Sequence, residues 1–501
     1  MPDITERTIT GINWNIIRVL VLSILRFTVM VVLARLIEPE YFGLISMATI
    51  FMTFIEYFSS IGVVPAIIQK KNLTKSYLSA AVYMSIITGV FAFVIIWFTS
   101  PYISIFFREE RLTNVLRMLS AVVIINGLAP VGIGLLIKEF KFKQLFIIDL
   151  SAYFFGYAGV SIVLAILGFK IWGLVIGIIA NQLITLLLIL FFSRFSFKPV
   201  FKLKEVKELL KFGKYFSIIR GFNYLGSIAD SVIIGRYMPA MQLGLYNRSS
   251  QLTNLPLTNF TETISNVMFP AYSRVQKDLK KIERGFLSSL NHVTIITIPL
   301  FAYMAVNSRY IMTGLFGPNW KDAATALTIL SVAGIFKSSV VLTSPVTQST
   351  ANVYSEAWRQ LVFAILLTAG AIYAIRFGIE GVSLAVMLSS IWLYFSMAQI
   401  AIKILKSTWK KYMLSQTPGL LISIIIIIIN IPINILMDNK VFEISYIYRF
   451  LIVTFLYLII YFSCILLLPE KIKGPVPKLV VKRYEKHFPL FFKKFLSKNL
   501  K

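Results

Sequence analysis

Charged residues and the usual metal ligands are scarce in this sequence. Only 14% of its 501 residues are Asp, Glu, Lys or Arg, against roughly 25% in an average soluble domain. Cys464 is the single cysteine, and His292 and His487 are the two histidines. One cysteine and two histidines are too few for a disulfide framework, a Cys-based metal site or a His-rich metal site. A Walker A pattern for ATP and a DxD pair for nucleotide-sugar chemistry are also missing. No recognisable enzyme signature remains.

The sequence contains many long hydrophobic segments. Hydrophobic residues make up 57% of the chain. Leu78–Phe98, Leu145–Leu167 and Ile171–Phe192 are examples of such runs. At about 1.5 Å rise per residue, each is long enough to cross roughly 30 Å of hydrocarbon as a helix. Backbone groups in lipid must be hydrogen-bonded within the segment. The sequence therefore predicts an all-α polytopic membrane protein with about fourteen transmembrane helices.

Basic residues gather in every second loop between the predicted spans. Lys70–Lys75, Lys138–Lys143, Arg194–Lys214, Arg274–Arg284 and Lys403–Lys411 are strongly basic, and the intervening loops are nearly balanced. The positive-inside rule places the basic set in the cytoplasm, and both termini with it. The net charge of +28 is thus explained by topology and does not indicate nucleic-acid binding.

The chain repeats itself. Val31–Leu36 resembles Val232–Tyr237, and Gly43–Leu44 resembles Gly244–Leu245, at a constant offset of 201 residues (244 − 43). An even number of predicted spans separates the copies, so the repeats run parallel, as in several transporter folds. We expect two pseudo-symmetric six-helix bundles, at 1–193 and 205–403, then two additional transmembrane helices at 416–468. A basic cytoplasmic tail follows at 469–501, either an amphipathic segment on anionic inner-leaflet lipids or a disordered tail.

Polar side chains within the predicted spans mark the candidate working surface, because they are costly in lipid and usually face a cavity. Arginines of the first, seventh and eighth spans are candidates for binding an anionic substrate: Arg18, Arg26, Arg220 and Arg248. Two polar stripes on the seventh and eighth spans are predicted to line a water-filled cavity: Asn223, Ser227, Gln251, Thr258, Asn259 and Asn266. Three acids are candidates for binding a coupling proton or Na⁺: Asp230, Glu262 and Glu56.

Other interpretations of these residues stay open. Snorkelling to the cytoplasmic interface explains Arg18 equally well. The arginines of the predicted cavity can also pair with Asp230 or Glu262 and merely hold the bundles together. Glu56 and Glu262 can be protonated hydrogen-bonding groups with a structural role. Pro256, inside the eighth span, is expected to kink that helix.

Several short segments, in order and spacing, resemble a known family. They are Thr8–Trp14, Tyr41–Leu44, Lys138–Phe142, Val267–Tyr272 and Leu315–Trp320. Together they look like the polysaccharide exporters of the multidrug/oligosaccharidyl-lipid/polysaccharide flippase superfamily, in particular the branch with colanic-acid and teichuronic-acid exporters. The resemblance runs from about residue 8 to about residue 345.

The resemblance implies a flippase and not an enzyme. Its substrate would be a polyprenyl-pyrophosphate-linked oligosaccharide, moved from the cytoplasmic to the outer leaflet of a prokaryotic cytoplasmic (inner) membrane by alternating access. We expect no cofactor, coupling of transport to a Na⁺ or H⁺ gradient or to the membrane potential, and a polysaccharide polymerase and glycosyltransferases as partners. The substrate role of the arginines is inferred from their forked donors, which match phosphate geometry.

Two rival functions are weighed against the flippase. A drug/cation antiporter of the same fold should have a net acidic cavity, whereas the arginines point to an anionic substrate. A membrane-embedded glycan polymerase or ligase usually needs a sizeable outer loop, and no loop much longer than about twenty residues is predicted here.

Overall fold

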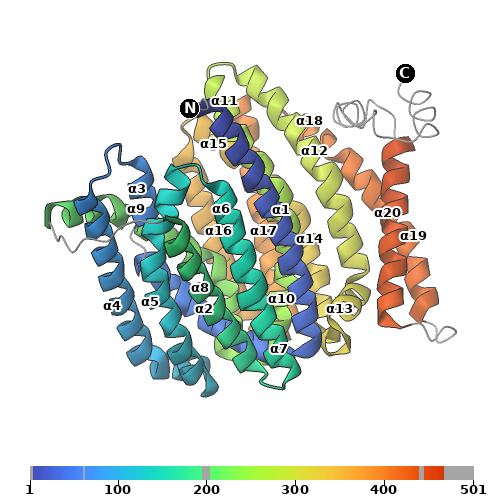
Figure 1. The fold of residues 1–501 in the computed structure, drawn as a ribbon. Helices are drawn as coiled ribbons and strands as arrows, with labels where there is room; N and C mark the ends of the chain where they lie inside the picture. The colour runs from blue at the N-terminus through green and yellow to red at the C-terminus, as the bar shows by residue number, and fades with distance from the viewer. Residues whose placement is uncertain (1–3, 60–61, 194–202, 439–444, 468–501) are drawn as a thin grey trace, which may run out of the picture. The chain divides into compact units, whose positions relative to one another are not determined.

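The computed structural model describes residues 4–59, 62–193, 203–438 and 445–467, and its described residues are helical with no strand (Figure 1). The predicted tail at 469–501 lies outside the described residues. The chain divides into two compact units, Met1–Gly244 and Leu245–Lys501. The predicted bundle boundaries rest on the sequence repeat and stay a prediction beside this division.

Ten described helical segments are long and apolar enough to cross a membrane. One of them, Val353–Leu405, has 53 residues. At about 1.5 Å per residue it would extend roughly 80 Å, more than twice the hydrocarbon thickness. The short 3₁₀ turn η4 (Ile375–Phe377) divides it into α16 and α17. The prediction of an all-α polytopic membrane protein is confirmed, and the count of fourteen spans stays a prediction.

The first unit contains long helices joined by short connections. Their bounds are α1 Ile4–Leu36, α2 Pro39–Ser59, α3 Val63–Gln69, α4 Lys75–Phe107, α5 Arg111–Lys138, α6 Phe142–Ser151, the π-helix η1 Ala152–Val160, α7 Ser161–Ile166, α8 Ile171–Ser193 and α9 Leu203–Tyr237. Figure 1 shows α4 and α5 side by side, and they are in extensive contact. Their backbones approach so closely at Gly127 that a Cβ on this residue would lie 2.7 Å from the Ser85 carbonyl oxygen. Helix α9 packs against α2 and α4, and α1 packs against α6.

A close backbone crossing within the first unit joins the two copies of the sequence repeat. A Cβ on Gly43 would lie 1.7 Å from the carbonyl oxygen of Ala240. A Cβ on Gly244 would lie 2.0 Å from the carbonyl oxygen of Pro39. Both residue pairs differ by the repeat offset, 201 (244 − 43 and 240 − 39). The contact is therefore reciprocal, as expected where a local two-fold axis relates two copies of one surface.

The second unit continues with helices of more varied length. Their bounds are α10 Ala240–Pro256, which begins at the end of the first unit, the π-helix η2 Leu257–Glu262, α11 Thr263–Arg274, α12 Leu279–Val306, α13 Ser308–Phe316, the 3₁₀-helix η3 Pro318–Ala323, α14 Ala324–Val340, α15 Ser344–Ser349, α16 Val353–Ala374, α17 Gly378–Leu405, α18 Trp409–Leu414, α19 Thr417–Asp438 and α20 Tyr446–Leu467. The core of this unit includes the buried side chains of Phe286, Tyr394, Met397 and Tyr412.

Polar contacts attach the two last helices to the second unit. Asn307 Nδ2 donates to Asn430 Oδ1 at 3.2 Å, which joins the end of α12 to α19. Tyr303 and Thr454 share a hydrogen bond of 2.6 Å between their hydroxyl groups, which joins α12 to α20. In lipid the hydrophobic effect does not drive helices together, so interhelical hydrogen bonds of this kind contribute to their association. Helices α19 and α20 are thus specifically docked on α12.

Candidate functional site

A polar face runs along α10, η2 and α11 in the second unit. The predicted cavity residues of this segment share one side of the helix and are exposed: Gln251, Thr258, Asn259 and Asn266, with the candidate acid Glu262. The opposite side, with Leu252, Leu257 and Thr261, is buried in the unit. We call the exposed residues the α10–α11 polar face. Lipid tails offer no hydrogen-bond partners to these amides and this carboxylate, so the face requires water or a polar ligand.

Pro256 marks a change of helix type within this face. The sequence predicts a kink at Pro256, and the structure has the π-helix η2 directly after it, at Leu257–Glu262. Proline lacks the N–H that an α-helix needs, which disturbs the hydrogen-bond ladder at this point. Single π-helical turns inside α-helices are frequent at functional sites. Two cavity candidates, Thr258 and Asn259, lie on this turn.

The candidate arginines have different surroundings. Arg248 Nη1 donates to Gln251 Oε1 at 2.7 Å, so a predicted substrate-binding cation and a predicted cavity amide are brought together on α10. Arg26 is exposed in the middle of α1, with its guanidinium carbon 5.7 Å from the centre of the Tyr153 ring. The Tyr153 ring orients Arg26 without neutralising its charge.

Arg18 forms an ion pair that the sequence analysis missed. Its Nη2 and Nε lie 2.5 Å and 2.7 Å from Asp149 Oδ2, which ties α1 to α6. Both side chains are largely buried, with 29% and 25% of their surfaces exposed. The only hint in the sequence is the position of both charges near the cytoplasmic ends of their predicted spans. The substrate role of Arg18 stays a prediction beside this structural contact.

The stripe on α9 is described only in part. Ser227 is exposed, and its Oγ donates to the Tyr224 carbonyl oxygen at 2.8 Å. Asp230 Oδ1 accepts a hydrogen bond of 2.7 Å from the Ser231 N–H. The side chains of Arg220 and Asn223 lie outside the described residues, so their predicted roles stay predictions.

Glu56 lines a separate cavity of about 260 Å³ between α2, α4, α5 and α8 in the first unit. Asn126 Nδ2 donates to Glu56 Oε1 at 2.9 Å. Gln182 and Thr185 add further polar groups to the lining. The sequence singles out Glu56 but not these partners, because each partner is an isolated polar residue on its own span. Within the described ranges, no group of three His, Cys, Asp or Glu side chains is placed to hold a metal ion.

Comparison with known proteins gives a consistent result. Residues 32–325 match the family model described as polysaccharide biosynthesis protein. The chain is 23% identical to the lipopolysaccharide biosynthesis protein WzxC of Escherichia coli (strain K12), over 87% of this chain and 90% of that protein. It is 27% identical to the teichuronic acid biosynthesis protein TuaB of Bacillus subtilis (strain 168), over 67% of this chain and 70% of that protein.

The fold resembles that of a solved membrane transporter. The lipid II flippase MurJ, in an inward closed conformation, superposes with a TM-score of 0.71. The superposition covers 95% of this chain and 99% of that chain, at 16% sequence identity. At this identity the likeness establishes the fold and leaves the substrate to be argued from the residues.

Proposed function

This chain belongs to the family of polysaccharide biosynthesis proteins, and on that premise we propose that it is a lipid-linked oligosaccharide flippase. It moves a polyprenyl-pyrophosphate-linked repeat unit from the cytoplasmic to the outer leaflet of a prokaryotic inner membrane. The α10–α11 polar face carries this proposal, because it places amides and hydroxyls on the exposed side of the predicted eighth span, with the half-buried Arg248 hydrogen-bonded to Gln251 on the same segment. Hydroxyl-rich glycans and phosphates are the ligands that such groups hydrogen-bond.

In this mechanism the arginines replace the water around the pyrophosphate. A guanidinium presents paired N–H donors to phosphate oxygens and keeps its charge at all physiological pH values. Arg248 is already oriented by Gln251, which lowers the entropy lost when the pair meets an anion. Outward movement of the anion is favoured by an inside-negative potential, by about 2.3 kcal/mol per charge per 100 mV.

We propose that the cavity at Glu56 binds the coupling ion, a proton or Na⁺. Its oxygen atoms come from a carboxylate, two amides and two hydroxyls: Glu56, Asn126, Gln182, Thr185 and Ser85. Hard cations prefer such oxygen ligands, and an intramembrane carboxylate is also a natural proton carrier. Asp230 and Glu262 are further candidates for the same role.

The proposed topology has both termini and the segment between α8 and α9 in the cytoplasm. The alternation of basic loops supports it. A reporter domain that is active only in the cytoplasm should be active when fused after residue 501. A reporter that is active only outside the cytoplasm should be inactive at the same position. A polysaccharide polymerase on the outer side and glycosyltransferases on the inner side are the partners that this direction of transport requires.

A reconstituted flipping assay tests the function. The full chain is placed in vesicles that carry a fluorescent polyprenyl-pyrophosphoryl oligosaccharide, and exposure of the glycan on the opposite leaflet is measured. We expect the Arg220→Ala/Arg248→Ala double variant to lose at least tenfold in rate, since each arginine contributes charge-assisted hydrogen bonds.

Arg376→Ala is the control, because Arg376 is an exposed arginine outside the α10–α11 polar face that stacks on Tyr373, 4.1 Å from its ring centre. Its flipping rate should equal that of the wild type. Transport of organic cations with no glycan flipping would support the antiporter instead. Unchanged flipping by the double-Ala variant would remove the arginines from the mechanism.

A further inference from the structure

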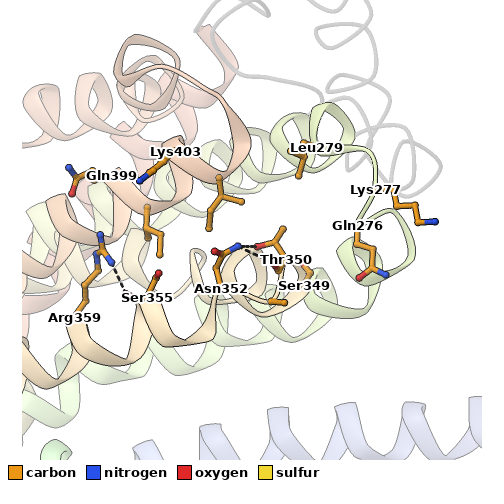
Figure 2. A pocket seen from close by; sticks show the side chains of 13 residues that line it. Gln276, Lys277, Leu279, Ser349, Thr350, Asn352, Ser355, Arg359, Gln399 and Lys403 are labelled. Atoms are coloured by element: carbon orange, nitrogen blue, oxygen red, sulfur yellow. Dashed lines mark hydrogen bonds between the residues drawn. The ribbon is translucent and has the colours of Figure 1, made fainter.

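A second polar cavity lies in the second unit, away from the α10–α11 polar face (Figure 2). Its volume is about 760 Å³, within the range of small-molecule sites. The walls come from the connection between α11 and α12, the connection between α15 and α16, the first turns of α16 and the last turns of α17. The lining includes three cationic side chains, Lys277, Arg359 and Lys403, and no acidic one. We call it the α16–α17 pocket.

Two of these cations converge at one end of the pocket. Ser396, Gln399 and Lys403 follow each other at spacings of three and four residues, so they share one face of α17. Arg359 Nε donates to the Ser396 carbonyl oxygen at 3.1 Å, which holds the guanidinium against this face. Figure 2 shows Arg359, Gln399 and Lys403 together at this end, and Lys277 at the other end.

The guanidinium of Arg359 is held in place by its neighbours. Its Nη1 donates to the Ser355 carbonyl oxygen at 2.6 Å, and its central carbon lies 4.4 Å from the centre of the Trp358 ring. Neither partner neutralises its charge. The acid one turn earlier, Glu356, accepts hydrogen bonds from Ser344 and Thr347, so its carboxylate is directed to α15. The pocket therefore keeps a net positive charge.

The connection between α15 and α16, which lies between the two ends, supplies hydrogen-bonding groups. Asn352 Nδ2 donates to the carbonyl oxygen of Thr350 at 2.9 Å. Ala351 between them has a φ of 57°, a left-handed conformation that is unfavourable for a residue with a Cβ. The surrounding hydrogen bonds hold this turn in place, including that from the Asn352 N–H to the Thr347 carbonyl oxygen at 2.8 Å. Strained turns of this kind concentrate at binding sites.

The level of the pocket in the membrane follows from helix α16. At its start Tyr354 and Trp358 are exposed, by 91% and 49% of their surfaces. One and two turns later the exposed side chains include the aliphatic Leu361 and Ile365. This order is typical of a helix that passes from the interface into hydrocarbon. The neighbouring basic loops predict that this interface is the cytoplasmic one. The pocket thus lies at the depth of the inner-leaflet head groups.

We propose that the α16–α17 pocket binds the phosphate-bearing, hydroxylated head group of a lipid in the cytoplasmic leaflet. Arg359 and Lys403 contact the phosphate, and the amides of Gln399 and Asn352 contact hydroxyl groups. A glycerophospholipid and a polyprenyl-pyrophosphoryl sugar share this chemistry. The proposal does not rest on the flippase function, because it concerns equilibrium binding at a site outside the α10–α11 polar face.

Lipid binding to the purified full chain tests the proposal. In detergent, the protein is titrated with short-chain phosphatidylglycerol, with a polyprenyl-pyrophosphoryl sugar and with zwitterionic phosphatidylcholine, and Kd is measured by native mass spectrometry. We expect Lys403→Gln to weaken anionic-lipid binding about tenfold and Arg359→Gln/Lys403→Gln about a hundredfold. Lys403→Gln is informative alone, since the exposed ammonium group has no ion pair or hydrogen bond to the described residues whose loss would destabilise the fold.

Two exposed cations outside the pocket serve as matched controls. Arg376→Gln removes another ring-stacked arginine, and Lys410→Gln removes another exposed lysine of the same basic loop. Both should bind all three lipids as the wild type does. If the pocket variants lose affinity only for the polyprenyl-pyrophosphoryl sugar, the pocket is assigned to the transport substrate. If they also lose affinity for phosphatidylglycerol, it is assigned to bulk anionic lipid. Wild-type affinity in both pocket variants, or an equal loss for phosphatidylcholine, overturns the proposal.

Discussion

Arginines within the predicted spans are stabilised by three different kinds of contact. Arg18 has a carboxylate, Asp149, at 2.5 Å. Arg248 has an amide oxygen, that of Gln251, at 2.7 Å. Arg26 has an aromatic ring, that of Tyr153. A carboxylate neutralises the charge, whereas a ring only orients it, so Arg26 keeps the capacity to attract an anion.

This difference predicts opposite outcomes for two matched substitutions. Arg18→Gln leaves Asp149 as an unpaired, largely buried carboxylate, so we expect a loss of about 1–3 kcal/mol in stability and a lower Tm in detergent. The added change Asp149→Asn should restore most of that loss. Arg26→Gln should leave Tm nearly unchanged and reduce glycan flipping.

A double-mutant cycle over Arg18 and Asp149 measures their coupling directly. A coupling free energy near zero contradicts the structural role of this ion pair. Full flipping activity in Arg26→Gln contradicts the substrate role of Arg26.

At the scale of helices, glycine determines how closely two elements cross. The N-terminal ends of α2 and α10 meet at Gly43 and Gly244, where a Cβ would lie 1.7 Å and 2.0 Å from a carbonyl oxygen. Backbone atoms cannot move aside as the end of a side chain can. The crossing therefore has to open if either glycine gains a side chain.

We expect Gly43→Ala and Gly244→Ala each to lower the Tm of the purified protein, with a similar size of effect because the contact is reciprocal. Gly226→Ala is the control, since a Cβ at this position of α9 has no neighbour within 4 Å. In a helix interior Ala is favoured over Gly by roughly 0.5–1 kcal/mol, so this variant should match or exceed the wild-type Tm. Wild-type stability in Gly43→Ala would show that the crossing is not tightly packed.

At the scale of the whole molecule, the α10–α11 polar face predicts which side of the segment is wet. After removal of the single cysteine by Cys464→Ser, Thr258→Cys and Asn266→Cys should react with a membrane-impermeant thiol reagent in native membranes. Thr261→Cys, on the same segment but fully buried, should stay unreactive. Leu361→Cys, exposed on the apolar side of α16, should also stay unreactive because lipid covers it.

Equal protection at positions 258 and 266 would mean that protein or lipid covers the polar face. Equal reactivity at 258 and 261 would mean that the segment is locally unfolded. Either pattern would contradict a hydrated cavity lined by this segment.

Hydrophobicity, loop charge and the internal repeat predict the helical fold, the orientation in the membrane and the repeated organisation of this protein from sequence alone. Lipid permits only backbones that satisfy their own hydrogen bonds, so long apolar runs predict helices directly. The expense of polar groups in lipid likewise predicts the exposed stripe at Thr258 and Asn266 from sequence alone. The family also follows from short segments whose order and spacing are preserved along the chain.

Contacts between distant segments were decided only by the tertiary structure. Arg18 and Asp149 are 131 positions apart, and Glu56 and Asn126 are 70 apart. No local pattern links such residues, because their proximity depends on which helices pack together and in what rotation. The α16–α17 pocket has the same origin, since its walls come from two separate connections and from the turns of α16 and α17. Sequence periodicity specifies the faces of helices, and packing specifies what those faces meet.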